Sequence, residues 1–135
     1  MSPQELGCER CLALYRTMAT IRAFEERIRD LSTAGRIPGF VHVSIGQEAV
    51  AAGVAAALEP RDRITSTHRG HGHLIAKGGP ETVDRMMAEI FGRRTGYCKG
   101  KGGSMHIVDF SLGILGANGI VGAGIPIATG AALAA

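Results

Sequence analysis

From Ser111 to Ala135 the sequence carries no charged side chain, which is unusual for a segment that faces water. The stretch is long enough for a membrane helix, which needs about 20 apolar residues. However, it contains Asn118, Pro126 and six glycines, and its large apolar residues are scattered. We therefore expect a segment that is buried in protein, and no membrane span.

The composition describes one folded domain that is rich in glycine. With 135 residues, of which 45% are hydrophobic and 20% charged, the chain can bury a core and differs from a disordered segment. Half of its 20 glycines follow residue 95, and such residues allow close backbone approaches, as in phosphate-binding loops. The formal net charge of +3 favours anionic ligands. Nucleic acid is not expected as a partner, because only 4% of the residues are aromatic and could stack on bases.

The cysteines and the N-terminus indicate a reducing compartment. Three cysteines cannot make a disulfide framework, and Cys8 and Cys11 lack the second pair that a four-ligand zinc site requires. Residues 1–5 contain neither a basic region nor an apolar signal stretch. We expect a cytoplasmic chain with reduced thiols.

Apolar periodicity predicts a long helix over residues 9–34. Apolar residues recur at steps of three and four, so they form one stripe that we interpret as a core-facing surface. Gly35 fits a C-cap, and Pro38 prevents continuation of the helix. The stripe consists of Leu14, Met18, Ile21, Phe24, Ile28 and Leu31.

Four further elements are predicted along the rest of the chain. An alanine-rich helix is expected over 47–58, with Ser44 as its cap. The β-branched segment 62–67 predicts a short strand. Residues 80–91 have proline near the start and glycine after the end, which is typical of a helix. The alanine run after Pro126 predicts a last helix with small side chains.

The segment THRGHGH at residues 67–73 is the most informative cluster. A strand that runs into a glycine-containing turn suits a phosphate group, because Arg69 is planar and permanently charged and the backbone N–H groups are accessible. Its three histidines also invite a metal ion, although no acidic or cysteine ligand is close in sequence. We favour phosphate or anion contact, with a metal site and a solvated polar turn as the alternatives.

Three other features have more than one interpretation. The basic segment 99–106 lacks the order of a nucleotide-binding P-loop, so its glycines indicate either a close approach to a ligand or a mobile surface loop. The glycine-dense segment 116–126 suits tight helix packing or a flat ligand lying on backbone. His42 lies between two valines, a setting more typical of a core histidine with satisfied hydrogen bonds.

Taken together, four ordered motifs resemble one known family. They are FVHVSIGQEA (40–49), THRGHG (67–72), KGKGGSMH (99–106) and NGIVGA (118–123). The sequence resembles the alpha subunit of the thiamin-diphosphate-dependent, decarboxylating component of 2-oxoacid dehydrogenase complexes, of the pyruvate and acetoin dehydrogenase type. The resemblance extends from about Leu14 to Ala135.

This resemblance implies an α/β thiamin-diphosphate-binding fold with a parallel sheet flanked by helices. Residues 1–135 would be the N-terminal part of one such domain, in which the helix 9–34 is followed by cofactor-binding segments over 36–135 and the sheet is incomplete. The uncharged stretch would then be a core segment of that larger domain. The resemblance also implies a heterotetramer of two alpha and two beta chains, with thiamin diphosphate at the alpha–beta interface.

The motifs also assign site residues. The candidate catalytic residues are His42 and His71, and His42 would face the reacting centre, where an imidazole suits proton transfer. Arg69 would neutralise charge on the diphosphate together with the residue at position 68. The cofactor-binding candidates are His68, Arg69, Gly119 and Val121.

The resemblance further implies a reaction and its partners. The component would decarboxylate pyruvate or cleave acetoin, and pass the acyl unit to the lipoyl domain of the acyltransferase component. His68 favours the acetoin branch, because mammalian-type pyruvate enzymes carry tyrosine there. The family's Mg²⁺ motif is absent from 1–135, so the Mg²⁺ ligands are expected beyond Ala135 and the segment alone is expected to be inactive. The alternatives are a free-standing basic anion-binding module and a metal-binding protein built on the histidine cluster.

Overall fold

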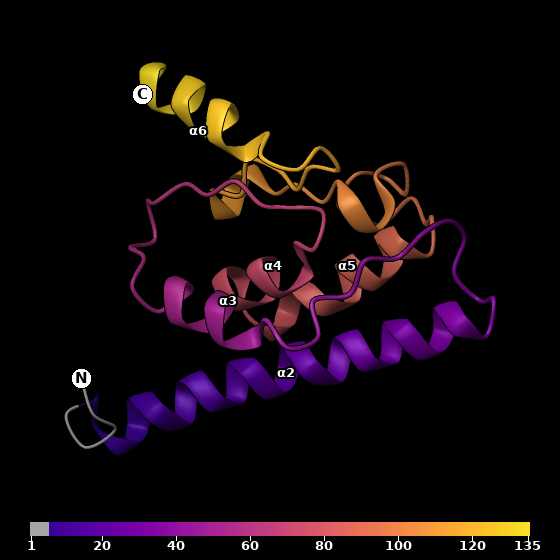
Figure 1. Ribbon diagram of the computed structural model, residues 1–135, viewed down its shortest axis with the longest axis horizontal. Helices are drawn as coiled ribbons and strands as arrows, with labels where there is room; N and C mark the ends of the chain where they lie inside the picture. The colour runs from indigo at the N-terminus through magenta and orange to yellow at the C-terminus, as the bar shows by residue number, and fades with distance from the viewer. Residues whose placement is uncertain (1–5) are drawn as a thin grey trace.

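The computed structural model describes residues 6–135; residues 1–5, which carry the prediction of no targeting signal, lie outside the described part. The described chain is mainly helical (Figure 1). Its elements are α2 (Cys8–Thr33), α3 (Glu48–Ala55), α4 (His71–Gly78), η1 (Pro80–Thr82), α5 (Val83–Ile90), η2 (Gly103–Met105), η3 (Phe110–Leu112) and α6 (Gly124–Leu133).

The long helix α2 confirms the prediction made from its apolar stripe. Ile21, Phe24 and Ile28 are buried, and α2 runs along one side of the molecule beneath α3, α4 and α5 (Figure 1). The helix ends one residue before the predicted boundary. Gly35 has a φ of 67°, which glycine tolerates, and its N–H donates to the Ser32 carbonyl at 2.9 Å.

The core lies where α2, α3 and α4 pack against one another and α5 closes the far side. The approach of α4 to α2 leaves little room for a side chain at Gly72. A Cβ at Gly72 would lie 3.2 Å from Cγ2 of Ile21 and 3.3 Å from Oγ of Ser44. The buried apolar residues of the cluster are Ile21, Phe24, Ile28, Ile37, Ala51, Leu74, Ile75, Met86, Ile90, Ile107 and Ile114.

Three local expectations differ from the structure. The glycine-containing turn expected within residues 67–73 is followed directly by helix α4, which begins at His71. Helix α3 is shorter than predicted. Gln47 is its N-cap, and the hydroxyl of Ser44 does not cap it but donates to Glu25 at 2.7 Å.

The predicted parallel sheet is not present in residues 6–135, where no strand is formed. In place of a strand over 62–67 there is one parallel bridge between Ile64 and Ile114. The Ile64 N–H donates to the Gly113 carbonyl at 2.9 Å, and the Leu115 N–H donates to the Ile64 carbonyl at 2.8 Å. Ile114 also forms an antiparallel bridge with Asp109, but these isolated bridges do not extend into strands within residues 6–135.

The uncharged segment forms α6, on the opposite side of the molecule from α2 (Figure 1). Pro126 lies in the first turn of the helix, where its missing N–H costs no hydrogen bond. Within the uncharged segment Ile114 is buried and belongs to the core, but the burial expected for the rest is not found. No residue of α6 is buried, and Ile125 and Leu133 are 75% and 91% exposed. No helix among residues 6–135 has the length and apolar character needed to cross a membrane.

Candidate functional site

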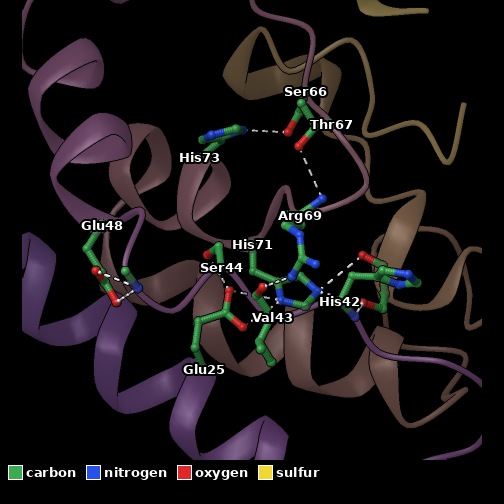
Figure 2. Close-up of polar contacts among 12 residues, drawn as sticks. Glu25, His42, Val43, Ser44, Glu48, Ser66, Thr67, Arg69, His71 and His73 are labelled. Carbon is green, nitrogen blue, oxygen red and sulfur yellow. Dashed lines mark hydrogen bonds and ion pairs between the residues drawn. The ribbon is translucent and has the colours of Figure 1, made fainter. Parts of the chain in front are cut away.

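The start of α4 lies beside the segment that contains His42 (Figure 2). The Arg69 guanidinium donates through Nη1 to the Val43 carbonyl, and the Arg69 N–H donates to Oγ1 of Thr67 at 3.2 Å. Two motifs that are far apart in sequence therefore meet at one arginine. Arg69 thus contacts the residue that follows His42 in the chain.

His42 and His68 form the open part of this site. Their rings meet edge to face, with centroids 5.3 Å apart and an interplanar angle of 85°. Both residues are half-buried, and within residues 6–135 the Nδ1 atoms of both are buried and have no hydrogen-bond partner. A buried polar atom without a partner is costly. His42 is therefore not the satisfied core histidine that its sequence setting favoured, because its Nδ1, like that of His68, has no hydrogen-bond partner within residues 6–135.

His71 has a different environment, because it is completely buried. Its Nδ1 lies 3.1 Å from both carboxylate oxygens of Glu25, and its Nε2 lies 3.0 Å from the Ser104 hydroxyl (Figure 2). The ring of Phe24 packs edge-on against the His71 ring, with the two ring centroids 5.7 Å apart. His71 therefore contacts protein groups at both ring nitrogens, and the sequence-based candidate has no surface for a substrate.

Glu25 and Ser104 are the residues that sequence reasoning missed. Glu25 lies on the buried stripe of α2, four residues after Ile21 and three before Ile28, and a charged residue at that position was an available signal. Ser104 directly follows residues 98–103, the glycine-rich loop, and its contact with His71 spans 33 positions in sequence. Only the folded chain brings these side chains together.

His73, the third histidine of the cluster, faces away from the other two. Its Nδ1 lies 2.7 Å from the hydroxyl of Ser66, and burial lowers the pKa of the His73 imidazole. His73 borders a small apolar cavity of about 120 Å³ between α3 and residues 64–65. Because the three imidazoles have different partners, they do not converge on one point. Residues 6–135 contain no group of three or more histidine, cysteine, aspartate or glutamate residues that could hold a metal ion.

The loop before α3 is held by a buried carboxylate. Glu48 accepts hydrogen bonds from Nε of Arg22 at 2.6 Å and from the Gly46 N–H at 3.0 Å. The Arg22 hydrogen bond lowers the pKa of Glu48 to about 2, with the Gly46 N–H acting in the same direction. This pair joins α2 to the segment that leads from His42 into α3.

The two remaining cofactor-binding candidates lie in different places. Val121 is 81% exposed and, with Ser66 and Thr67, borders a hollow of about 190 Å³. Gly119 lies against His106, since a Cβ on it would be 3.5 Å from Cε1 of that ring. The structure thus brings Val121 to the THRGHGH segment, whereas Gly119 does not line that hollow.

The glycine-rich loop serves a different purpose from either interpretation of its sequence. Its backbone N–H groups converge on the carboxylate of Glu89, which is completely buried at the end of α5. The donors are the N–H groups of Cys98, Gly100, Gly102 and Gly103, at 2.7, 2.9, 2.8 and 3.1 Å. The loop is ordered around an anion of the chain itself, and those four N–H groups are occupied.

Comparison with known proteins gives a consistent result. Residues 16–135 match the family described as the dehydrogenase E1 component. The chain is 59% identical over 127 residues to the alpha subunit of acetoin:2,6-dichlorophenolindophenol oxidoreductase from Bacillus subtilis (strain 168), an alignment that covers 94% of this chain and 38% of that protein. It is 57% identical over 130 residues to the subunit of the same name from Cupriavidus necator. This alignment covers 96% of this chain and 38% of that protein.

The alpha subunit of a pyruvate dehydrogenase E1 component is also similar. The protein from Zymomonas mobilis is 49% identical over 127 residues, which cover 93% of this chain and 35% of that protein. The chain therefore spans little more than a third of the length of these curated relatives.

Proposed function

Because the chain belongs to the dehydrogenase E1 component family, we propose that it is part of the alpha subunit of a thiamin-diphosphate-dependent dehydrogenase. The proposed reaction is the decarboxylation of pyruvate or the cleavage of acetoin, followed by transfer of the acyl unit to lipoamide of the acyltransferase component. The proposed partners are a beta subunit, in a heterotetramer, and the lipoyl domain of that component.

One observation carries the proposal, namely that a permanent cation and two unsatisfied imidazole nitrogens lie at the start of α4. Arg69 has further N–H donors besides the one that reaches Val43, and these suit the oxygens of a diphosphate. The unpartnered Nδ1 of His68 can complete such a contact. The exposed Val121, beside Ser66 and Thr67, offers apolar surface next to this charge. The residues present therefore fit the diphosphate end of the cofactor.

Each residue then has a chemical role. When bound, thiamin diphosphate supplies a carbon nucleophile and an electron sink for bond cleavage beside a carbonyl group. Arg69 would bind and orient the diphosphate, which is a positioning role. His42 would hold or deliver a proton at Nδ1, because this atom has no partner within residues 6–135. The Mg²⁺ ligands would lie outside residues 6–135, which contain no cluster of side chains that could hold a metal ion.

The fold proposal rests on the Ile64–Ile114 bridge. This pairing is parallel, and the Ser66 N–H continues it by donating to the Gly116 carbonyl at 2.9 Å. We assign the two segments to the start of a parallel sheet that further chain would complete. Exposed apolar residues of α6 support the same assignment, because such residues are typical of a helix that packs on other protein.

The substrate proposal leans toward acetoin. The relatives named for acetoin are 59% and 57% identical, against 49% for the pyruvate dehydrogenase subunit from Zymomonas mobilis. His68 supports the same branch, and its ring contacts the proposed catalytic imidazole of His42. Pyruvate and branched 2-oxoacids remain the competing substrates.

The test is an assay of the full-length alpha chain together with its beta subunit. Acetoin, pyruvate and branched 2-oxoacids would each be supplied with thiamin diphosphate and Mg²⁺, and product formation would be measured with and without the cofactor. We expect cofactor-dependent turnover that is fastest with acetoin. Activity that does not depend on thiamin diphosphate, or stoichiometric zinc binding that is lost in His71→Ala, would refute the proposal.

A further inference from the structure

A continuous path of hydrogen bonds, buried up to Ser104 and partly buried at its last step, leads from α2 to the backbone of His42 (Figure 2). The Glu25 carboxylate meets Nδ1 of His71 at 3.1 Å. On the other side of the ring, Nε2 meets both the carbonyl and the hydroxyl oxygen of Ser104, at 3.1 and 3.0 Å. That hydroxyl oxygen also accepts the His42 N–H at 3.2 Å. The path joins four segments that are distant in sequence.

The Glu25 end of the path is buried and held by two hydrogen-bond partners. Glu25 and His71 are 0% exposed, and the second donor to the Glu25 carboxylate is the Ser44 hydroxyl at 2.7 Å. Polar contacts of this kind are strong when water is excluded, and their geometry is fixed when all members are satisfied. Ser44 lies two residues after His42, so Glu25 holds the same segment from a second direction.

The polarity of the path follows from its acceptors. Nε2 of His71 faces the carbonyl and hydroxyl oxygens of Ser104, whereas Nδ1 faces the Glu25 carboxylate. A carbonyl oxygen can only accept, so a group at the position of Nε2 must donate to satisfy it. The two ring nitrogens therefore have separate roles, because Nδ1 fixes the ring to α2 and Nε2 fixes Ser104.

We propose that Glu25 and His71 are positioning residues, which hold Ser104 so that its hydroxyl accepts the His42 N–H and sets the His42 imidazole against His68. His71 then acts on the site only through Ser104. The catalytic role of His42 rests on the function proposed above. Its placement by this path does not, so the two can fail separately.

The matched variants are His71→Gln and His71→Asn. A glutamine amide nitrogen lies close to the position of Nε2 and can donate to Ser104, whereas an asparagine amide nitrogen lies close to Nδ1 and can reach only Glu25. Ser104→Ala removes the hydroxyl and leaves the Glu25–His71 pair intact. Together the three variants distinguish the effect of a lost hydrogen bond to Ser104 from the effect of disturbed packing around His71.

Hydrogen–deuterium exchange of the full-length protein, assembled with its partner subunits, measures the result at the His42 amide. The Phe91 amide, which donates to the Met87 carbonyl at 3.0 Å, is the reference. We expect His71→Asn and Ser104→Ala to speed exchange at His42 about tenfold relative to Phe91, the effect of losing one hydrogen bond. We expect His71→Gln to change it by less than about threefold.

Equal acceleration in both His71 variants would overturn the proposal, because it would indicate a purely structural role. Unchanged His42 exchange in Ser104→Ala would also overturn it, and that variant decides the question if the His71 variants do not fold. If His42 exchange responds as expected while turnover does not, the positioning path stands and the catalytic assignment of His42 fails.

Discussion

Oε2 of Glu89 accepts a hydrogen bond from the Gly100 N–H at 2.9 Å, so the end of α5 and the glycine-rich loop form one unit. A Cβ at Gly100 would overlap the backbone of Gly92, and the φ of Gly100 is 76°, so only glycine fits there. Burial of the Glu89 carboxylate is tolerated because four N–H groups replace its water. The loop geometry therefore depends on the charge of Glu89.

We expect Glu89→Gln to lower the free energy of unfolding by about 3 kcal/mol or more. The glutamine amide would present donors to backbone donors, so two N–H groups would lose their acceptor in a buried place. Urea denaturation measures the change. The control is Glu59→Gln at an exposed pair with Arg61, where a change within about 1 kcal/mol is expected. Equal effects of the two variants would contradict the role given to Glu89.

The lowered pKa of Glu48 predicts a specific dependence of the free energy of unfolding on pH. Its pKa falls from 4.5 to about 2 in the folded chain, chiefly through the Arg22 hydrogen bond. Because the folded value lies below the unfolded value, ionised Glu48 stabilises the fold above pH 4.5, and this contribution is lost as the pH falls toward 2. We expect the stability difference between the unmodified chain and Glu48→Gln to shrink across this window.

Urea denaturation at a series of pH values checks this expectation. Arg22→Gln should remove the same pH-dependent difference, because the two side chains act as one pair. A difference between the unmodified chain and Glu48→Gln that stays constant from pH 4.5 down to 2 would show that Glu48 titrates normally.

The local parts of this molecule are the parts that the sequence predicts. Helix α2 follows from a stripe that repeats every three or four residues, and its end follows from Gly35. The motifs single out His42 and Arg69 separately, and only the fold shows that their two segments meet at the Val43 carbonyl.

The features that the sequence did not predict depend on contacts between segments that are distant in sequence. Helix α4 contains glycines that lower helix propensity, and it forms because Gly72 lets it pack closely on α2. Ser104 meets the His42 N–H across 62 positions, which no periodicity encodes. The carboxylate that orders the loop over residues 98–103 comes from α5, so the loop sequence alone does not identify it.

Gly70 provides a test of the packing at the start of α4. A Cβ there would lie 2.5 Å from Oγ of Ser66 and 3.1 Å from Cβ of Ala117. We expect Gly70→Ala to lower the free energy of unfolding by about 1–3 kcal/mol, because Ser66 is held by His73 and by its backbone bond to Gly116. Thermal or urea unfolding measures the change.

Gly53 is the matched control. It lies in α3, and a Cβ there would have no heavy atom within 4 Å. Gly53→Ala should therefore stabilise the chain by about 0.5–1 kcal/mol through helix propensity. If the two substitutions change the free energy of unfolding in the same direction and by the same amount, crowding at Gly70 does not explain the effect of Gly70→Ala.

Substitutions of Arg69 and His42 should affect different quantities, cofactor affinity in the first case and kcat in the second. With full-length alpha chain and beta subunit, we expect Arg69→Ala to weaken thiamin diphosphate binding by roughly 10- to 100-fold, the loss of charged hydrogen bonds. We expect His42→Ala to lower kcat by roughly 100-fold or more, with little effect on cofactor binding. Calorimetry and steady-state kinetics measure the two effects, and the reverse pattern would exchange the two roles.

The control for charge is Arg93→Ala. Arg93 is exposed and follows the C-terminal end of α5. Removing it lowers the net charge by the same amount as Arg69→Ala but leaves the contact between Arg69 and Val43 intact. We expect cofactor binding to change by less than about threefold, as is typical of an exposed surface charge.

The isolated chain of residues 1–135 should bind thiamin diphosphate weakly even with Mg²⁺ present. Arg69 and His68 offer groups for a diphosphate, but residues 6–135 contain no cluster of ligands for the cation that would offset its charge. An anion bound without that cation depends on one arginine and a few partial charges, so we expect an affinity no tighter than about 0.1–1 mM. Isothermal titration calorimetry measures it, and tight one-to-one binding would show that the site is complete within these residues.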